Sequence, residues 1–192
     1  MRKTGPLCVL VCYVLWGLLP AFWKLLGDVN ALYVLGARVV WSMVLTGAVL
    51  LWRRDRLSGV RAALRDRRER CLLPAAGCAI FVNWGVYIWA TVNGHLLDAS
   101  LAYYMNPILA VLLGTVVFRE RLTALQWTAV AVTLMGLMAA VIRWGQFPWI
   151  ALVIGGSFAV YGALKKTVRS DAAVSTFLET VSYTHLTLPT IL

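Results

Sequence analysis

Six apolar segments recur along the chain, separated by short polar or basic stretches. Each is close in length to the ~20 residues that a helix needs to cross the hydrocarbon core of a bilayer. An open sheet in lipid would leave backbone groups without hydrogen-bond partners, so these segments are expected to be helices. The pattern predicts an all-α polytopic membrane protein with about six transmembrane helices, over residues 6–25, 30–52, 72–93, 98–118, 123–142 and 147–164.

The composition supports this fold class and changes the meaning of the net charge. Apolar residues make up 61% of the chain and charged residues 14%, whereas a soluble domain is about half apolar and about a quarter charged. A net charge of +10 could suggest a nucleic-acid partner, but the arginines gather in one stretch between two apolar segments. We therefore predict the lipid bilayer, and no nucleic acid, as a partner. The stretch comprises Arg53, Arg54, Arg56, Arg61, Arg65, Arg67, Arg68 and Arg70.

The basic residues also predict the orientation in the membrane. The N-terminus, the 53–70 loop, the turn after 118 and the stretch after 164 are rich in lysine and arginine, while the loops at 26–29, 94–97 and 143–146 are nearly free of them. Cytoplasmic loops carry such an excess. We predict a multi-pass protein of the bacterial inner membrane with a cytoplasmic N-terminus. Because the other connections are short, sequential helices are expected to be antiparallel neighbours. The basic loop has a second interpretation, docking to lipid headgroups or to a protein.

Arg38 lies deep within the second apolar segment. It is about nine residues inside the segment, or about 13 Å at ~1.5 Å per helical residue, which is close to the bilayer midplane. An arginine at that depth costs about 2.5–3.5 kcal/mol. A charge kept at this cost indicates a polar interior path, and Trp41 and Ser42 fall on the same helix face as Arg38.

The fourth apolar segment contains a proline next to polar residues. Pro107 has no N–H, so the carbonyl of Tyr103 loses its helical partner beside Tyr104 and Asn106. Interrupted helices near the midplane mark transporter sites. A proline kink healed by neighbouring helices is the alternative.

Other polar side chains allow two interpretations each. Asn83, Tyr87 and Thr91 form a stripe that either faces a substrate or makes interhelical hydrogen bonds. His95 and Asp98 form either a proton relay or a solvated turn in which Asp98 caps the next helix. The tryptophans deep within the segments either line a path or fill the bundle; they are Trp16, Trp41, Trp84 and Trp89.

Motifs for catalysis and metal binding are absent from the sequence. It contains no nucleophile–base pair, HExxH, phosphate-binding loop or paired carboxylates. The cysteines lack the spacing of metal ligands and have no histidine partner. We predict no enzymatic activity, no cofactor and no metal. The cysteines are Cys8, Cys12, Cys71 and Cys78.

The end of the chain departs from the preceding pattern. Phe177 to Glu179 looks like the start of another helix, but VSYTHLTLPT at 181–190 resembles a translated transposase mosaic-end sequencing adapter. We interpret 181–192 as a read-through artefact and exclude it from the predicted fold.

Several stretches resemble the RarD branch of the EamA-type drug/metabolite transporter superfamily. They are YVLWGLLPAFWKLL (13–26), ARVVWS (37–42), NWGVYIWATVNGHLLDASLAYYMNPILAVLLG (83–114) and FRERLTALQWTAV (118–130). The resemblance implies a ten-helix inner-membrane permease built from two inverted five-helix repeats, some members of which are chloramphenicol-sensitivity proteins. Residues 1–142 would form the first repeat and 143–180 the start of the second, with one helix. Arg38, Pro107 and Glu120 match residues of the family.

These observations lead to the hypothesis of a permease that moves a small organic solute by alternating access. Two alternatives remain: a membrane interaction or regulatory protein that uses the basic loop, and a membrane-embedded enzyme that uses His95 and Asp98. A homodimer is left open. The predicted substrate-binding residues are Arg38, Trp41, Tyr87, Tyr103, Tyr104, Asn106 and Pro107.

The interpretation of the tail can be tested on the source DNA. If 181–192 is read through from an adapter, sequencing of the source gene past codon 180 should find an open frame with about four further apolar spans, since two repeats place the solute site between them. An in-frame stop directly after VSYTHLTLPTIL in that DNA would contradict this prediction.

Overall fold

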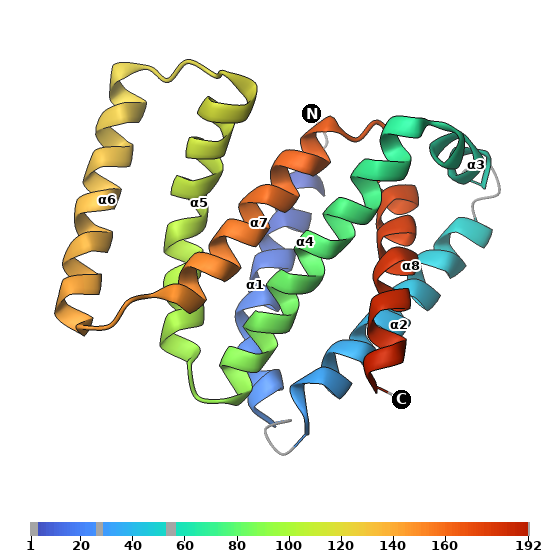
Figure 1. Cartoon of the computed structure of the whole chain (residues 1–192), viewed down its shortest axis with the longest axis horizontal. Coiled ribbons are helices and arrows are strands. Elements are labelled where there is room, and N and C mark those ends of the chain that lie inside the picture. Colours follow the sequence, from blue (N-terminus) through green and yellow to red (C-terminus); the bar gives the residue numbers. More distant parts are fainter. Residues whose placement is uncertain (1–3, 26–28, 53–56, 192) are drawn as a thin grey trace.

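The structure is a computed structural model that describes residues 4–25, 29–52 and 57–191, and these residues form helices joined by short connections (Figure 1). The first arginines of the basic loop, at 53–56, lie outside the described residues. The helices are α1 (Thr4–Leu25), α2 (Ala31–Trp52), α3 (Leu57–Arg65), α4 (Arg67–Val92), α5 (Leu96–Phe118), α6 (Ala124–Trp144), α7 (Trp149–Thr167) and α8 (Ala172–Ile191).

Five of these helices are long and apolar enough to cross a membrane, which confirms the polytopic helical fold. They are α1, α2, α4, α5 and α6. The sixth predicted span, 147–164, coincides with α7, which is not among the five within the described part of the chain. Lys165 and Lys166 in its last turn lower the hydropathy of this short helix.

The predicted basic loop is partly helical. Residues 57–65 form α3, and α4 begins at Arg67 rather than near residue 72. Asp66 explains the earlier start, because its Oδ1 accepts a hydrogen bond of 2.8 Å from the N–H of Arg68 and so caps α4. The prediction of a plain loop is therefore wrong for the described part of this stretch.

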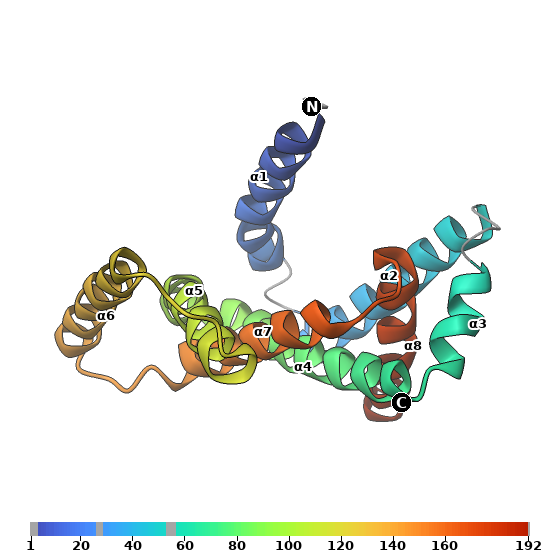
Figure 2. The ribbon, with the colours of Figure 1, turned by 90° about the horizontal axis from the view of Figure 1, so that it is seen from above.

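The central helices do not follow the predicted order of neighbours. From one edge of the layer to the other, the order is α6, α5, α7, α4, α8 and α2, and the most extensive contacts join α7 to α5 and α4 (Figure 1). Figure 2 shows α1 standing away from one face of this layer. The prediction that sequential helices would be neighbours is thus wrong at the centre, where α7 lies between α4 and α5.

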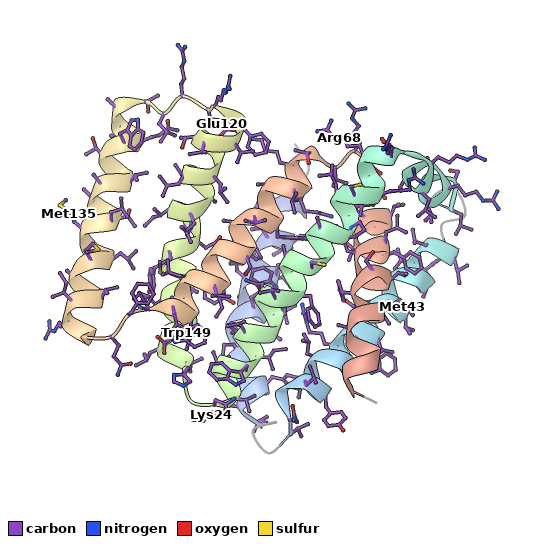
Figure 3. The ribbon with its side chains drawn as sticks, viewed as in Figure 1. Lys24, Met43, Arg68, Glu120, Met135 and Trp149 are labelled. Atoms are coloured by element: carbon purple, nitrogen blue, oxygen red, sulfur yellow. The ribbon has the colours of Figure 1, made fainter. Side chains whose placement is uncertain are left out.

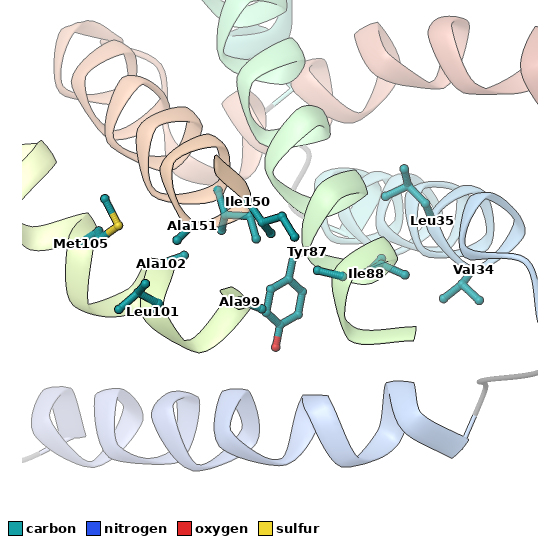
Figure 4. Packing of buried hydrophobic residues seen from close by; sticks show 12 residues of the cluster. Val34, Leu35, Tyr87, Ile88, Ala99, Leu101, Ala102, Met105, Ile150 and Ala151 are labelled. Carbon is teal, nitrogen blue, oxygen red and sulfur yellow. The ribbon is translucent and has the colours of Figure 1, made fainter. Parts of the chain in front are cut away.

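Small residues that recur every four positions on α7 allow it to approach α5 closely; they are Gly155, Ala159 and Ala163. A Cβ atom on Gly155 would lie 3.1 Å from Leu109 Cδ1 and 3.4 Å from the carbonyl oxygen of Ala102, both on α5. Close backbone approach of this kind is how helices associate where lipid surrounds them. In the resulting core, Tyr87 and Ile88 of α4 lie among residues of α5 and α7 (Figure 4).

A buried ion pair joins α7 to α8. Lys165 Nζ lies 2.8 Å from Glu179 Oε1, and Glu179 is only 2% exposed. Tyr161 donates a hydrogen bond of 3.2 Å to the other carboxylate oxygen, and Lys165 also donates to Ser175. A buried carboxylate needs such partners, because a charge without them is costly away from water.

The segment 181–191 continues α8 without a break. Thr184 is buried, and the backbone of Glu179 passes 3.2 Å from the position of a Cβ on Gly77 of α4. The tail that we excluded from the predicted fold is therefore helical here. Its origin as a read-through artefact stays a prediction, as do the domain boundaries at 142 and 180.

Alanine at Gly155 and at its neighbour Gly156 should have different effects. A Cβ on Gly156 would meet nothing within 4 Å, so Gly156→Ala should stabilise the helix by about 1 kcal/mol. Gly155→Ala should lose most of that gain, because Leu109 must move. Thermal unfolding in detergent, followed by circular dichroism, compares the two variants, and equal shifts in Tm would contradict the close contact.

Breaking the ion pair on one side should be worse than removing both charges. Lys165→Met or Glu179→Leu alone should destabilise the protein by about 3–5 kcal/mol, since each leaves the other charge unpaired. The double variant should be more stable than either single variant in the same unfolding assay. Lys166→Met is the matched control, because its half-exposed partner Glu120 makes that pair worth less than about 1 kcal/mol. Strictly additive effects of the two substitutions would refute the coupling.

Candidate functional site

Arg38 of α2 lies against an indole ring of α4. Its guanidinium carbon is 3.3 Å from the centre of the Trp84 ring, and the residue is partly buried. A cation over an aromatic face is worth up to about 2 kcal/mol when it is desolvated. The structure thus gives the arginine a partner that offsets part of the cost of its depth. It also makes Trp84 the residue that holds Arg38 in place.

A row of aromatic rings continues from Trp84 across α4 to α5. Trp84 and Tyr87 meet edge to face with 5.7 Å between ring centres, and Tyr87 and Tyr103 do so at 6.0 Å. Edge-to-face contacts are a favoured geometry for aromatic pairs. Three predicted site residues, Arg38, Tyr87 and Tyr103, are therefore brought into one continuous row, with Trp84 as the link.

A small cavity of about 30 Å³ lies beside the guanidinium group. It has room for about one water molecule. One wall comes from Tyr183, in the segment of the predicted read-through tail. The lining residues are Leu35, Arg38, Val39, Ile80, Phe81, Trp84 and Tyr183.

A larger cavity of about 250 Å³ lies between α5 and α7. Its α5 wall is a stripe with a spacing of four residues that begins at Asn106 and ends at Phe118, and its α7 wall runs from Phe158 to Lys166. Asn106 Oδ1 is buried and has no hydrogen-bond partner among the described residues. The predicted site residue Asn106 therefore faces a second cavity rather than the small cavity at Arg38.

Glu120 lies at the end of this larger cavity and contacts Lys166 of α7. Its neighbours in the sequence are Arg119 and Arg121, but its ion-pair partner is Lys166. Arg119 adopts a left-handed conformation, with φ of 54°, which ends α5 and turns the chain. Figure 3 shows Glu120 at the same end of the helices as Arg68, with Lys24 and Trp149 at the opposite end.

The remaining predicted site residues face outward. Trp41 is 69% exposed and Tyr104 71%, so neither is gathered with Arg38. Pro107 is also exposed, and α5 continues through it without interruption. The predicted break at Pro107 is therefore absent, because the helix tolerates the proline. The long Arg38 side chain reaches Trp84 on α4. The indole of Trp41, which shares a face of α2 with Arg38 in the sequence pattern, is exposed instead.

Hydrogen bonds bear on two of the open alternatives. Asn83 Nδ2 donates to the carbonyl oxygen of Ile154 on α7 at 2.7 Å, and the Thr91 hydroxyl donates to the carbonyl oxygen of Tyr87 at 2.8 Å. The stripe thus bonds within and between helices. His95 Nδ1 lies 3.3 Å from Asp98 Oδ2, and no side chain caps α5. The predicted capping role of Asp98 is therefore wrong.

Sequence reasoning missed the buried pair of Lys165 and Glu179, and it missed Phe158 and Lys166 as residues that line the larger cavity. The four-residue spacing of Asn106, Ala110, Gly114 and Phe118 was the signal that could have revealed the cavity wall. No cluster of three or more histidine, cysteine or acidic side chains that could hold a metal occurs within the described ranges.

Comparison with known proteins identifies the family to which the chain is similar. Residues 3–142 match the model of the EamA-like transporter family. A protein named RarD from Streptomyces exfoliatus is 40% identical over 93% of this chain and 56% of its own length. An uncharacterised transporter of Vibrio cholerae is 41% identical over 93% of the chain and 59% of its own length.

A third relative is the chloramphenicol-sensitive protein RarD of Pseudomonas aeruginosa, which is 33% identical over 88% of the chain and 57% of its own length. The chain thus spans somewhat more than half the length of these relatives. No solved structure matches it. The family match and the RarD-named relatives, together with the apolar helices, show that the chain is a multi-pass membrane protein of the RarD type that belongs to the EamA-like transporter family.

Proposed function

We propose that the chain is part of a permease that moves a small organic solute across the bacterial inner membrane and has no enzymatic activity. The observation that carries this proposal is Arg38, held 3.3 Å over the Trp84 ring within an apolar helix. A charge at such depth marks a substrate or ion path in membrane proteins. The transporter names of the relatives support the same function.

The roles of the site residues follow from their chemistry. Arg38 neutralises a carboxylate or another anionic group of the solute, and Tyr87 and Tyr103 offer hydroxyl groups and ring edges along the row. Trp84 keeps the guanidinium group in place between transport events. The name of the Pseudomonas relative supports a solute class that includes amphipathic drugs of the chloramphenicol-sensitivity type.

Transport by alternating access requires a second repeat. In this proposal residues 1–142 supply one repeat, and the solute site of such transporters lies between two repeats near the midplane. A second repeat, either in the same polypeptide or in a second copy of the chain, completes the path around Arg38, and an ion gradient drives the cycle. The exposed Trp41 and Tyr104 then become contacts for that repeat.

The orientation follows from the basic residues. Arg68 of the basic stretch and Glu120 lie at one end of the helices (Figure 3). Lys166 contacts Glu120, so Lys165 and Lys166 in the last turn of α7 lie at the same end. The excess of positive charge assigns this end to the cytoplasm. The N-terminus is then cytoplasmic as well.

Replacement of Arg38 tests the function. Arg38→Ala in the intact gene product should abolish flux of organic anions into proteoliposomes, because the solute loses its counter-charge, and Arg38→Lys should retain part of the activity. The measurement is uptake of a panel of radiolabelled organic acids, amino acids and zwitterionic drugs. Arg121→Ala, an exposed cation outside the cavities, is the matched control. Unchanged flux of every solute in Arg38→Ala would remove the role assigned to this residue.

A further inference from the structure

The short helix α3 stands between two helices that can cross the membrane. It follows α2, which ends at Trp52, and precedes α4, which begins at Arg67. Figure 1 shows α3 at the end of the bundle where α4 begins. A helix that joins the ends of two spans lies at the membrane surface, and amphipathic helices there lie in the plane of the interface.

One face of α3 is packed against the rest of the protein. Ala63 is only 3% exposed and lies in a core cluster with Leu73 of α4 and Val174 of α8. Val60 packs against the same cluster, and a Cβ atom on Gly59 would lie 3.2 Å from Val174 Cγ2. This packing fixes which side chains of α3 point outward.

The outward side chains form a stripe of leucines beside a stripe of arginines. Leu57 and Leu64 lie about two helical turns apart, and they are 40% and 52% exposed. Arg61 and Arg65 are exposed as well, and residues at this spacing are neighbours on the helix surface. The mixture suits the boundary between headgroups and acyl chains, where leucines enter the apolar layer and guanidinium groups reach the phosphates.

The two acidic residues of this stretch bind backbone N–H groups rather than arginines. Residues 57–70 contain five arginines, all of them exposed, and none of the five forms an ion pair with another described residue. Asp66 Oδ1 accepts the N–H of Arg68. Glu69 is 4% exposed, and its Oε1 accepts two N–H groups of the connection between α7 and α8, at 2.8 Å each. The stretch therefore presents a net positive charge to its surroundings.

We propose that the outward face of α3 binds anionic phospholipids, with a headgroup phosphate on Arg61 and Arg65 and acyl carbons against Leu57 and Leu64. A guanidinium group matches a phosphate through paired N–H donors. A free phosphate has nothing to place against the leucines, and a soluble protein would have to approach a face that lies at the bilayer itself. The inference goes beyond the proposed transport function and does not depend on it.

Titration of lipid into the purified chain in detergent micelles tests the proposal. The reporter is Ala62→Cys, at an exposed position of α3, which is labelled with an environment-sensitive fluorophore after the four native cysteines are replaced by serine. Phosphatidylglycerol should shift the emission, whereas phosphatidylcholine should not, because its headgroup has no net charge. Inorganic phosphate should also leave the emission unchanged, because it brings no acyl chain.

Substitution of the arginines locates the site. Arg61→Gln combined with Arg65→Gln should raise the midpoint of the phosphatidylglycerol titration about 30-fold, because each arginine contributes to attraction by an anionic surface. The matched control is Arg119→Gln combined with Arg121→Gln, which removes two exposed arginines that flank Glu120. This control should leave the midpoint unchanged.

Substitution of the leucines tests the acyl contact. Leu57→Ser combined with Leu64→Ser should raise the same midpoint several-fold, since less apolar area then meets the lipid. The substituted side chains are exposed, so thermal unfolding in detergent without lipid should be the same for every variant.

Four results would overturn the lipid site. They are an equal response to phosphatidylcholine, an equal response to inorganic phosphate, an unchanged midpoint after the leucine substitutions, and an equal rise in the two arginine variants. The last result would mean that the reporter senses only the net charge of the chain. No response to any lipid would leave the face to water or to a soluble partner and would remove the proposal.

Discussion

Polar atoms inside an apolar helix bundle have no water to bond, and this constraint decides which helices of the chain meet. Asn83 of α4 reaches the carbonyl oxygen of Ile154 on α7, Glu179 of α8 holds Lys165 of α7, and Arg38 of α2 stacks on α4. An unpartnered group in each place would cost several kcal/mol. These contacts favour the placement of α7 and α8 among the earlier helices, where small residues let the backbones approach.

The features that could be predicted from the sequence are those set by local patterns. Apolar length predicted the helices that could cross a membrane. The isolated charge at Arg38 indicated a polar interior path beside this residue. The start of α4 at Arg67 could also have been predicted, because Asp66 is a good N-cap residue. The many arginines around it favoured the prediction of a loop instead.

The features that could not be predicted depend on which helices become neighbours. Glu120 lies between two arginines in the sequence, yet it contacts Lys166, which the turn at Arg119 brings to it. Trp41 shares a helix face with Arg38 in the sequence pattern, yet only the arginine reaches α4. Hydropathy ranks α7 below the other spans, although it has the most extensive contacts in the structure. Helix periodicity predicts which residues share a helix face, but which helix packs against that face depends on how all the helices are arranged.

The aromatic row and the larger cavity both reach α5, whereas the small cavity at Arg38 is lined by residues of α2, α4 and α8. Tyr103 ends the aromatic row from Arg38, and Asn106 forms the inner end of the larger cavity, three residues further along the same helix. Residues three apart in a helix are neighbours on its surface. The row from Arg38 and the larger cavity therefore reach adjacent positions on one helix, while the packed core of α4, α5 and α7 lies between the two cavities. Because Arg38 is already partly satisfied by the Trp84 ring, it would bind an anion loosely enough to release it, which transport requires of a site on a path.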